Sequence, residues 1–180
     1  MSGEPEDCQR CHGSEVICES DPALCPYEDE PPLAVRVLNL HGVALAAATE
    51  LARKFAGVVF ASGRRTVREQ ARAMAANAAA DVDFVRSTYV NSLAARRCQA
   101  WVDMHLTAKQ DQIAEAFERI LCDLPDSELA HLTRHVSGDA FDVVPSTAAV
   151  RAFLVELADR HGGKFLDHEG KLLRWHWEAK

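Results

Sequence analysis

The sequence predicts an α+β fold, with helices packed on a small antiparallel sheet. Helical patterns dominate the first part of the chain and strand patterns gather near its end, whereas a parallel α/β sheet would alternate the two. A hairpin pattern, which joins antiparallel strands, closes the chain. The 180 residues, 48% hydrophobic and 26% charged, have the size and composition of one globular domain.

The first elements are predicted to be a helix, a strand and a second helix. Residues 43–55 form an alanine-rich amphipathic helix pattern. Residues 58–61 are a short apolar run with β-branched side chains, which predicts a buried strand. A helix over 66–80 is expected next, because Thr66 and Glu69 have the spacing of a capping box.

Two more helices, over 92–105 and 109–122, are predicted in the middle of the chain. Cys98 and Cys122 fall within them and are expected to be buried thiols rather than reactive ones. The apolar face of the second helix is expected to consist of Ile113, Ala116, Phe117, Ile120 and Leu121.

The last elements are predicted to be a strand, a helix and a hairpin. Residues 136–144 alternate and contain β-branched side chains, which indicates a strand. Residues 147–161 have a helical pattern, and Gly162 follows as a stop signal. Residues 164–177 are predicted to form a hairpin that turns at Glu169-Gly170.

The acidic residues are concentrated at the N-terminus. Residues 1–32 contain nine acidic residues against one basic residue, together with four of the six cysteines and five of the seven prolines. We therefore expect an acidic, Cys- and Pro-rich segment followed by a domain over 33–180. That domain is close to neutral, and the basic excess of a nucleic-acid binder is missing, so no nucleic-acid partner is expected.

The N-terminal cysteines have three interpretations. Cys8, Cys11, Cys18 and Cys25 could bind a structural zinc ion, although only the first two form a close pair. They could instead form disulfides that staple the segment. The third interpretation is that they do neither.

The chain shows no targeting signal of the usual kind. No window approaches 18 uninterrupted apolar residues, so no membrane span is expected. Residues 1–7 lack the basic and apolar regions of a secretory signal. We therefore expect the protein to be made in the cytoplasm without a signal peptide.

Three residues of metal-binding type come from separate predicted elements. His135 and Asp142 lie on either side of a glycine, in a segment that ends in a predicted strand. His176 lies in the last hairpin. Two imidazoles and one carboxylate leave a fourth coordination position open, as a catalytic zinc site requires. Metal binding would also offset the cost of the Asp142 charge between two apolar neighbours.

Three blocks, in this order along the chain, carry a resemblance to a known family. Residues 62–70 (Ser-Gly-Arg-Arg-Thr-Val-Arg-Glu-Gln) are similar to Ser-Gly-Tyr-Arg-Ser-x-x-x-Gln. Residues 133–142 follow Ser/Thr-x-His-x-x-Gly-x-Ala-x-Asp, and Trp175-His176 lies near the C-terminus. Over roughly residues 40–178 the chain resembles the M15-type zinc peptidases, which are D-alanyl-D-alanine carboxypeptidases and dipeptidases and phage L-alanyl-D-glutamate endopeptidases. The resemblance implies a hedgehog/DD-peptidase-like fold.

The resemblance also implies roles for the matched residues. The two histidines and the aspartate named above match the zinc ligands. Arg65 matches an arginine that binds the substrate or the transition state, with a plain salt bridge as the alternative. Ser62 and Gln70 are expected to bind the substrate or support the site, with ordinary turn and helix-surface roles as the alternative.

The chain departs from the family pattern at four positions. Thr133 stands for serine, Arg64 for tyrosine and Thr66 for serine. The fourth departure removes a function, because the family has an acidic general base three residues before the last histidine and this chain has Leu173.

Another residue would have to supply the base. Glu178 is the preferred replacement, since it lies two residues after His176 and would share its face of a strand. Asp167, Glu169 and His168, on the other arm or the turn of the hairpin, are alternatives. A chain without any base is the last possibility.

The resemblance implies a zinc peptidase that cuts a peptidoglycan stem peptide at a bond involving a D-amino acid, as an endopeptidase or a carboxypeptidase. Acting as a lysis enzyme or a delivered toxin, it would reach the cell wall or periplasm after release or injection, with a delivery machine or an immunity protein as a further partner. The main alternative is a zinc-binding module without catalysis that binds the wall or a protein. A third hypothesis makes the Cys-rich segment an adaptor to a partner.

Overall fold

The computed structural model describes residues 30–89, 91–169 and 172–180, and Pro32–Lys180 form one compact unit. The described residues form nine helices and a four-stranded antiparallel sheet in the order β1-β2-β4-β3, which confirms the α+β prediction. The strands are β1 (Phe60–Ser62), β2 (Ala140–Val143), β3 (Lys164–Glu169) and β4 (Leu172–Glu178). The helices are α1 (Leu33–Arg36), α2 (Gly42–Lys54), α3 (Val67–Ala80), α4 (Phe84–Thr88), α5 (Leu93–Met104), α6 (Gln110–Cys122), α7 (Asp126–Leu132), α8 (Arg134–Ser137) and α9 (Ala148–His161).

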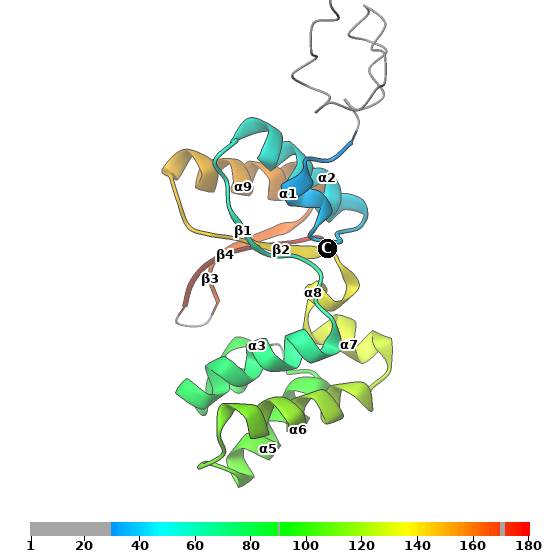
Figure 1. Ribbon diagram of the computed structural model, residues 1–180, viewed down its shortest axis with the longest axis vertical. Coiled ribbons are helices and arrows are strands. Elements are labelled where there is room, and N and C mark those ends of the chain that lie inside the picture. The colour runs from blue at the N-terminus through cyan, green and yellow to red at the C-terminus, as the bar shows by residue number, and fades with distance from the viewer. Residues whose placement is uncertain (1–29, 90, 170–171) are drawn as a thin grey trace, which may run out of the picture. The chain divides into compact units, whose positions relative to one another are not determined.

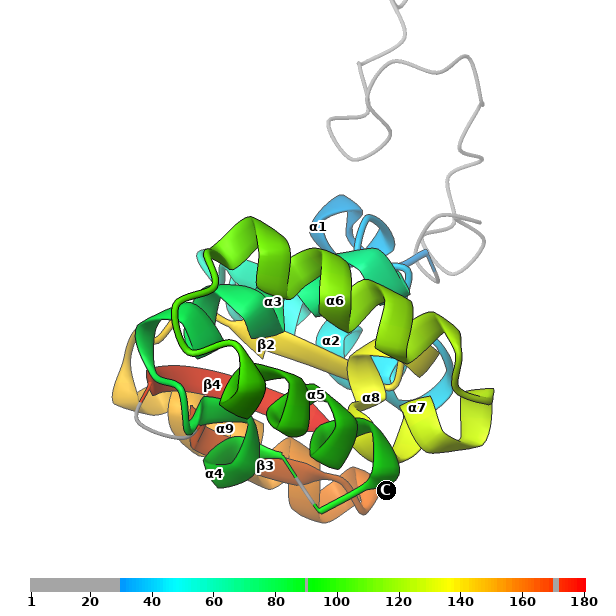
Figure 2. The same cartoon turned by 90° about the horizontal axis from the view of Figure 1, so that it is seen from below.

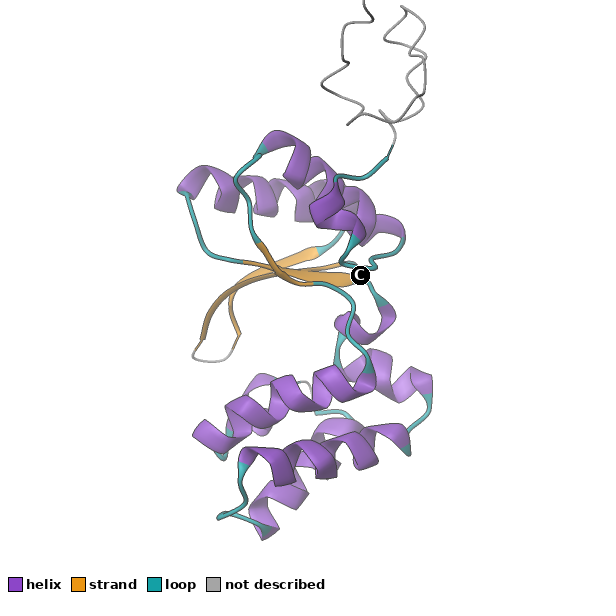
Figure 3. Cartoon of the chain, viewed as in Figure 1, coloured by secondary structure: helices purple, strands orange, loops and turns teal. Residues whose placement is uncertain are grey.

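The sheet is the middle layer of this unit (Figure 3). Helices α1, α2 and α9 cover one of its faces, and α3, α5, α6 and α7 lie on the other side (Figure 1). Helix α8 lies between the sheet and the second group of helices. Seen from that side, α3, α5 and α6 stand in front of β2 and β4 (Figure 2).

The covered face of the sheet holds one hydrophobic core. Phe141 of β2 and Trp177 of β4 are stacked there with their ring centroids 5.3 Å apart, and both are fully buried. Trp175 and Val143 join the same core with residues of α2 and α9. Because successive side chains of a strand point to opposite faces, the polar residues between these aromatics must face the other group of helices.

That other group has a separate hydrophobic core, built by α3 to α7. Met74, Cys98 and Phe117 are fully buried in it. Each side of the structure therefore has its own hydrophobic core, one against the sheet and one among α3 to α7. Polar groups that lie between the two cores interrupt neither of them.

The structure confirms the longer predicted helices. Helices α2, α5, α6 and α9 lie within a residue or two of their expected ends, and α3 begins with the capping box between Thr66 and Glu69. Cys98 is buried as expected, but Cys122 is exposed, so that part of the thiol prediction is wrong. Cys122 is the last residue of α6, and there the neighbouring Leu121 is the residue that is buried in the core.

The strand predicted over 136–144 is wrong in its first half. Residues 134–137 form the helical turn α8, and only Ala140–Val143 are extended. The turn begins because the Thr133 hydroxyl accepts the His135 N–H, and it ends because Gly138 adopts a left-handed conformation with φ of 84°. The strand expected at 58–61 begins at Phe60 and is partly exposed rather than buried. Helices α1, α4 and α7 are short and were not predicted.

None of the helices in the described ranges combines the length and apolar character that a membrane span requires. The segment 1–29, including the four N-terminal cysteines, and the hairpin turn at Gly170 lie outside the described residues.

Candidate metal centre

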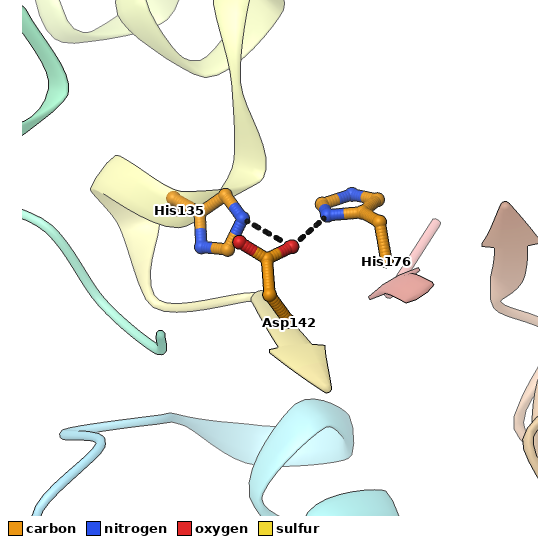
Figure 4. Close-up of side chains that lie close together, drawn as sticks. All are labelled: His135, Asp142 and His176. Carbon is orange, nitrogen blue, oxygen red and sulfur yellow. Dashed lines mark hydrogen bonds and ion pairs between the residues drawn. The ribbon is translucent and has the colours of Figure 1, made fainter. Parts of the chain in front are cut away.

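Three buried side chains meet on the sheet face that looks toward α3 and α6. They are His135 of α8, Asp142 of β2 and His176 of β4, which are 2%, 1% and 7% exposed. One nitrogen or oxygen atom from each lies within 4.8 Å of the others. Figure 4 shows the two rings on either side of the Asp142 carboxylate. This group could hold a metal ion.

Sheet register explains why residues so far apart in sequence meet here. Asp142 lies opposite Ser62 of β1 on one side and opposite His176 of β4 on the other, so the three form one row across the sheet. His135 reaches this row from α8, because the left-handed turn at Gly138 reverses the chain just before β2.

The His135 ring is oriented by the chain between β1 and α3. Its Nδ1 lies 2.7 Å from the carbonyl oxygen of Gly63, and since a carbonyl only accepts, Nδ1 carries the hydrogen. The other nitrogen, Nε2, faces Asp142, whose Oδ1 is 3.3 Å away, and with a metal ion bound it would offer its lone pair there. Metal-binding histidines are held in this way by an acceptor on their outer nitrogen.

The His176 ring bridges two carboxylates. Its Nδ1 is 3.0 Å from the same Oδ1 of Asp142, and its Nε2 is 3.2 Å from Oε2 of Glu178. Asp142 Oδ1 is thus the atom toward which both rings converge. Zinc ligands about 2.0–2.1 Å from a tetrahedral ion stand about 3.3 Å apart, close to the two distances here.

The other oxygen of Asp142, Oδ2, binds residues outside the group of three. Oδ2 accepts the Ser62 hydroxyl at 2.6 Å and the Arg65 guanidinium at 2.7 Å. Arg65 is itself held by Gln70, whose Oε1 is 3.1 Å away, and the Gln70 amide donates to the Tyr89 hydroxyl at 3.3 Å. This chain of contacts leaves Oδ1 as the carboxylate oxygen turned toward the rings.

The electrostatics of the site favour a cation among these groups. Burial alone would raise the pKa of Asp142, but the hydrogen bonds with His135 and His176 outweigh it and hold the pKa well below its usual range. Burial alone would lower the pKa of His176, but its bonds to Asp142 and Glu178 raise it to about 9. The bond to His176 in turn lowers the pKa of Glu178. A proton or a metal ion on Nδ1 of His176 would balance the negative charge of the Asp142 carboxylate.

The donor set fits zinc without identifying it. Two imidazole nitrogens and one carboxylate oxygen are ligands that zinc accepts, and three protein ligands are typical of catalytic rather than structural zinc sites. Each of the three donors has an outer partner that orients it, and such partners raise metal affinity.

The residues expected to bind the substrate hold the metal-binding group in place, either directly or through a neighbour. Ser62 and Arg65 bind Asp142, and Gln70 is 1% exposed with both ends of its amide bonded. The Gly63 carbonyl and Tyr89 complete these contacts, and neither was predicted. Gly63 had a sequence signal, since it follows Ser62 in the matched block, whereas Tyr89 had none.

The candidate bases are dispersed. Glu178 lies on the outer nitrogen of His176, and Asp167 is bound to Arg151 at 2.7 Å. His168 is exposed and contacts Asp167. Leu173 is 62% exposed, and the Glu169 side chain lies outside the described part of the structure. Arg174, which sequence reasoning passed over, brings its NH1 to 3.8 Å from Asp142 Oδ2.

Comparison of the chain with protein-family models, with curated proteins and with solved structures found no match in any of the three.

Proposed function

We propose that the protein is a zinc-dependent peptidase that hydrolyses a peptidoglycan peptide bond involving a D-amino acid, with a fold of the hedgehog/DD-peptidase type. One observation supports it above the others: His135, Asp142 and His176 converge in a buried group, and they are the residues that match the zinc ligands of the M15-type peptidases. The substrate class rests on the resemblance, because a fold and a metal site alone do not specify one.

The three residues would hold the ion through the ring nitrogens and the carboxylate oxygen that converge between them. Zinc, when bound, polarises a carbonyl and lowers the pKa of water to about 7. Ser62 and Arg65 keep the Asp142 carboxylate turned toward the two rings. In this proposal the Arg65 guanidinium also stabilises negative charge that develops on the scissile carbonyl oxygen.

The proposed reaction also needs a residue that accepts a proton. A general base must come within hydrogen-bond reach of the proton that it removes, directly or through one water. Asp167 is engaged with Arg151, and Glu178 with His176. Glu169, at the end of β3 and paired with Leu172, is tested by Glu169→Gln, which keeps the shape of the side chain and removes its basicity.

The second candidate is a zinc-binding module that recognises the wall or a protein without cleaving it. Two observations favour it: Leu173 replaces the acidic residue of the family pattern, and Glu178 is occupied on the outer side of His176. Such a module would keep the metal-binding group, so zinc binding alone does not separate it from the peptidase.

Mass spectrometry of purified peptidoglycan fragments separates the two candidates. The fragments are incubated with the zinc-loaded protein, with Asp142→Asn as the matched control because it keeps the shape of the side chain. New peptide ends that appear only with the unmodified protein support the peptidase and identify the bond. Intact fragments, from folded protein shown to hold zinc at this site, contradict the peptidase and favour the module.

A further inference from the structure

We infer that Glu178 is a positioning residue of the metal centre, which orients His176 to bind the ion through Nδ1. The inference rests on the metal centre of the proposed function, but not on peptidase activity. It assigns Glu178 a role different from the general base that the sequence suggests.

The two nitrogens of the His176 ring each face a different carboxylate. Nδ1 faces Asp142 Oδ1 at 3.0 Å, and Nε2 faces Glu178 Oε2 at 3.2 Å. A neutral imidazole has one N–H and one lone pair, and the nitrogen that binds a metal must offer the lone pair. The convergence of Nδ1 with Asp142 and His135 assigns the lone pair to Nδ1 and the hydrogen to Nε2. That hydrogen needs an acceptor, and Glu178 provides one.

The backbone holds Glu178 where this contact requires it. It follows His176 by two residues on β4, so both side chains project from the same face of the sheet. The strand is paired on both sides at this point, with Ala140 of β2 and with Lys164 of β3. Lys164 Nζ lies 3.8 Å from Oε1, while Oε2 is the oxygen that faces His176. The two carboxylate oxygens thus have separate partners.

Glu178 completes a set of outer contacts, one for each of the three donors. The Gly63 carbonyl orients His135, and Ser62 with Arg65 orients Asp142. Without Glu178, Nε2 of His176 would have no such partner, and His176 would differ in this from the other two donors. A carboxylate that accepts the outer N–H of a metal-binding histidine fixes its tautomer and raises its basicity.

The same geometry separates Glu178 from the position that a base must occupy. The imidazole ring of His176 stands between the Glu178 carboxylate and the converging donor atoms, since the two carboxylates contact opposite nitrogens of that ring. Glu178 therefore acts on the ion through His176 rather than on a proton at the open coordination position.

The test measures metal binding in Glu178→Ala and Glu178→Gln. Zinc affinity is determined by competition with a chelator, and the visible absorption of the cobalt-substituted protein reports the ligand geometry. The Ala variant is expected to lose about 10–100-fold in zinc affinity and to show a shifted cobalt spectrum. The Gln variant, whose amide oxygen still accepts the Nε2–H, is expected to recover most of the affinity and the unmodified spectrum.

Glu50→Ala is the matched control. It removes a glutamate that also lies against a histidine, with Glu50 Oε1 2.8 Å from His161 Nε2, but far from the donor atoms in the packing of α2 on α9. Zinc affinity and the cobalt spectrum should not change in this variant. Circular dichroism of each variant confirms that the comparison is between folded proteins.

Several outcomes would overturn the inference. The same affinity and cobalt spectrum in Glu178→Ala as in the unmodified protein would do so. Full metal binding in Glu178→Gln with loss of peptide cleavage would make Glu178 a base instead. If the unmodified protein binds zinc without cleaving peptidoglycan, the peptidase proposal fails while the role of Glu178 is still measured by affinity. If it binds no metal at the His135, Asp142 and His176 group, both fail.

Discussion

Asp142 on β2 lies directly opposite His176 on β4, and its Oδ1 is 3.0 Å from Nδ1 of that ring. This one strand pair brings together residues 34 positions apart in the sequence. A register slip of one residue would turn one of the two side chains into the aromatic core on the other face. The metal centre and the packing of Phe141 and Trp177 therefore depend on the same register.

The close approach of Gly63 to Leu38 predicts that this glycine cannot be replaced without cost. A Cβ at Gly63 would lie 2.4 Å from the Leu38 carbonyl oxygen, a backbone atom that cannot move aside easily. We expect Gly63→Ala to lower the free energy of unfolding by about 1–3 kcal/mol. Zinc affinity should fall as well, because the Gly63 carbonyl orients His135.

Urea unfolding and zinc competition measure these two effects. Gly57→Ala is the control, since a Cβ there meets no atom within 4 Å. Equal stability and affinity in the two variants would contradict the proposed dependence of His135 on this loop.

The buried amide of Gln70 predicts a second stability effect. Gln70→Ala leaves an Arg65 N–H and the Tyr89 hydroxyl without their bonds to this side chain, at a cost of about 1–3 kcal/mol. Thermal unfolding measures the change, with the exposed Gln110→Ala as the control. If Gln70 were an ordinary helix-surface residue, the two variants would have the same melting temperature.

The raised pKa of His176 predicts a pH dependence for the chelator-treated protein. Its folded-state pKa of about 9 lies above the ordinary value of 6.5, so the folded protein holds the proton more tightly than the unfolded chain does. This contribution is fully present below pH 6.5 and is lost as the pH rises through about 9. Stability should therefore fall over this window.

Urea unfolding at a series of pH values, in the presence of chelator, measures the slope. His176→Gln is the control, because it removes the titrating group, and its stability should vary less with pH over the same window. Parallel curves for the two proteins would show that His176 is not the group responsible.

The two cysteines within the described ranges predict opposite thiol reactivity. Burial raises the pKa of the Cys98 thiol to about 12, whereas Cys122 is exposed at the end of α6. Iodoacetamide should label Cys122 in the native protein, and Cys98 only after unfolding. Peptide mapping of the labelled sites reads this out, and rapid native labelling of Cys98 would contradict its place in the core.

Local sequence signals predicted the elements that depend on local contacts. The capping box at Thr66 and the left-handed Gly162 correctly located the start of α3 and the end of α9, because both act within a few residues. The metal-binding group was predicted from residue type and motif order, and the structure places its three members together. Trp175 and Trp177, which alternate with His176 along β4, lie in the hydrophobic core.

What the sequence could not indicate depends on contacts between distant backbones. The helical turn α8 was mistaken for strand because Val136 continues the β-branched pattern, while the deciding signals were Thr133 as a cap and Gly138 as a turn. The outer partners of the ligands include the Gly63 carbonyl, which has no side-chain signature. The contact of Glu178 with the outer nitrogen of His176 could not be predicted either, because the sequence spacing shows only that the two side chains share a face of the strand.

The most direct test of the metal centre is anomalous X-ray diffraction from crystals of the zinc-loaded protein. The account predicts a zinc peak about 2.0–2.2 Å from Nε2 of His135, Nδ1 of His176 and Oδ1 of Asp142. Crystals of Asp142→Asn should lose or weaken this peak. No peak at this position in the unmodified protein, or coordination of His176 through Nε2, would contradict the account.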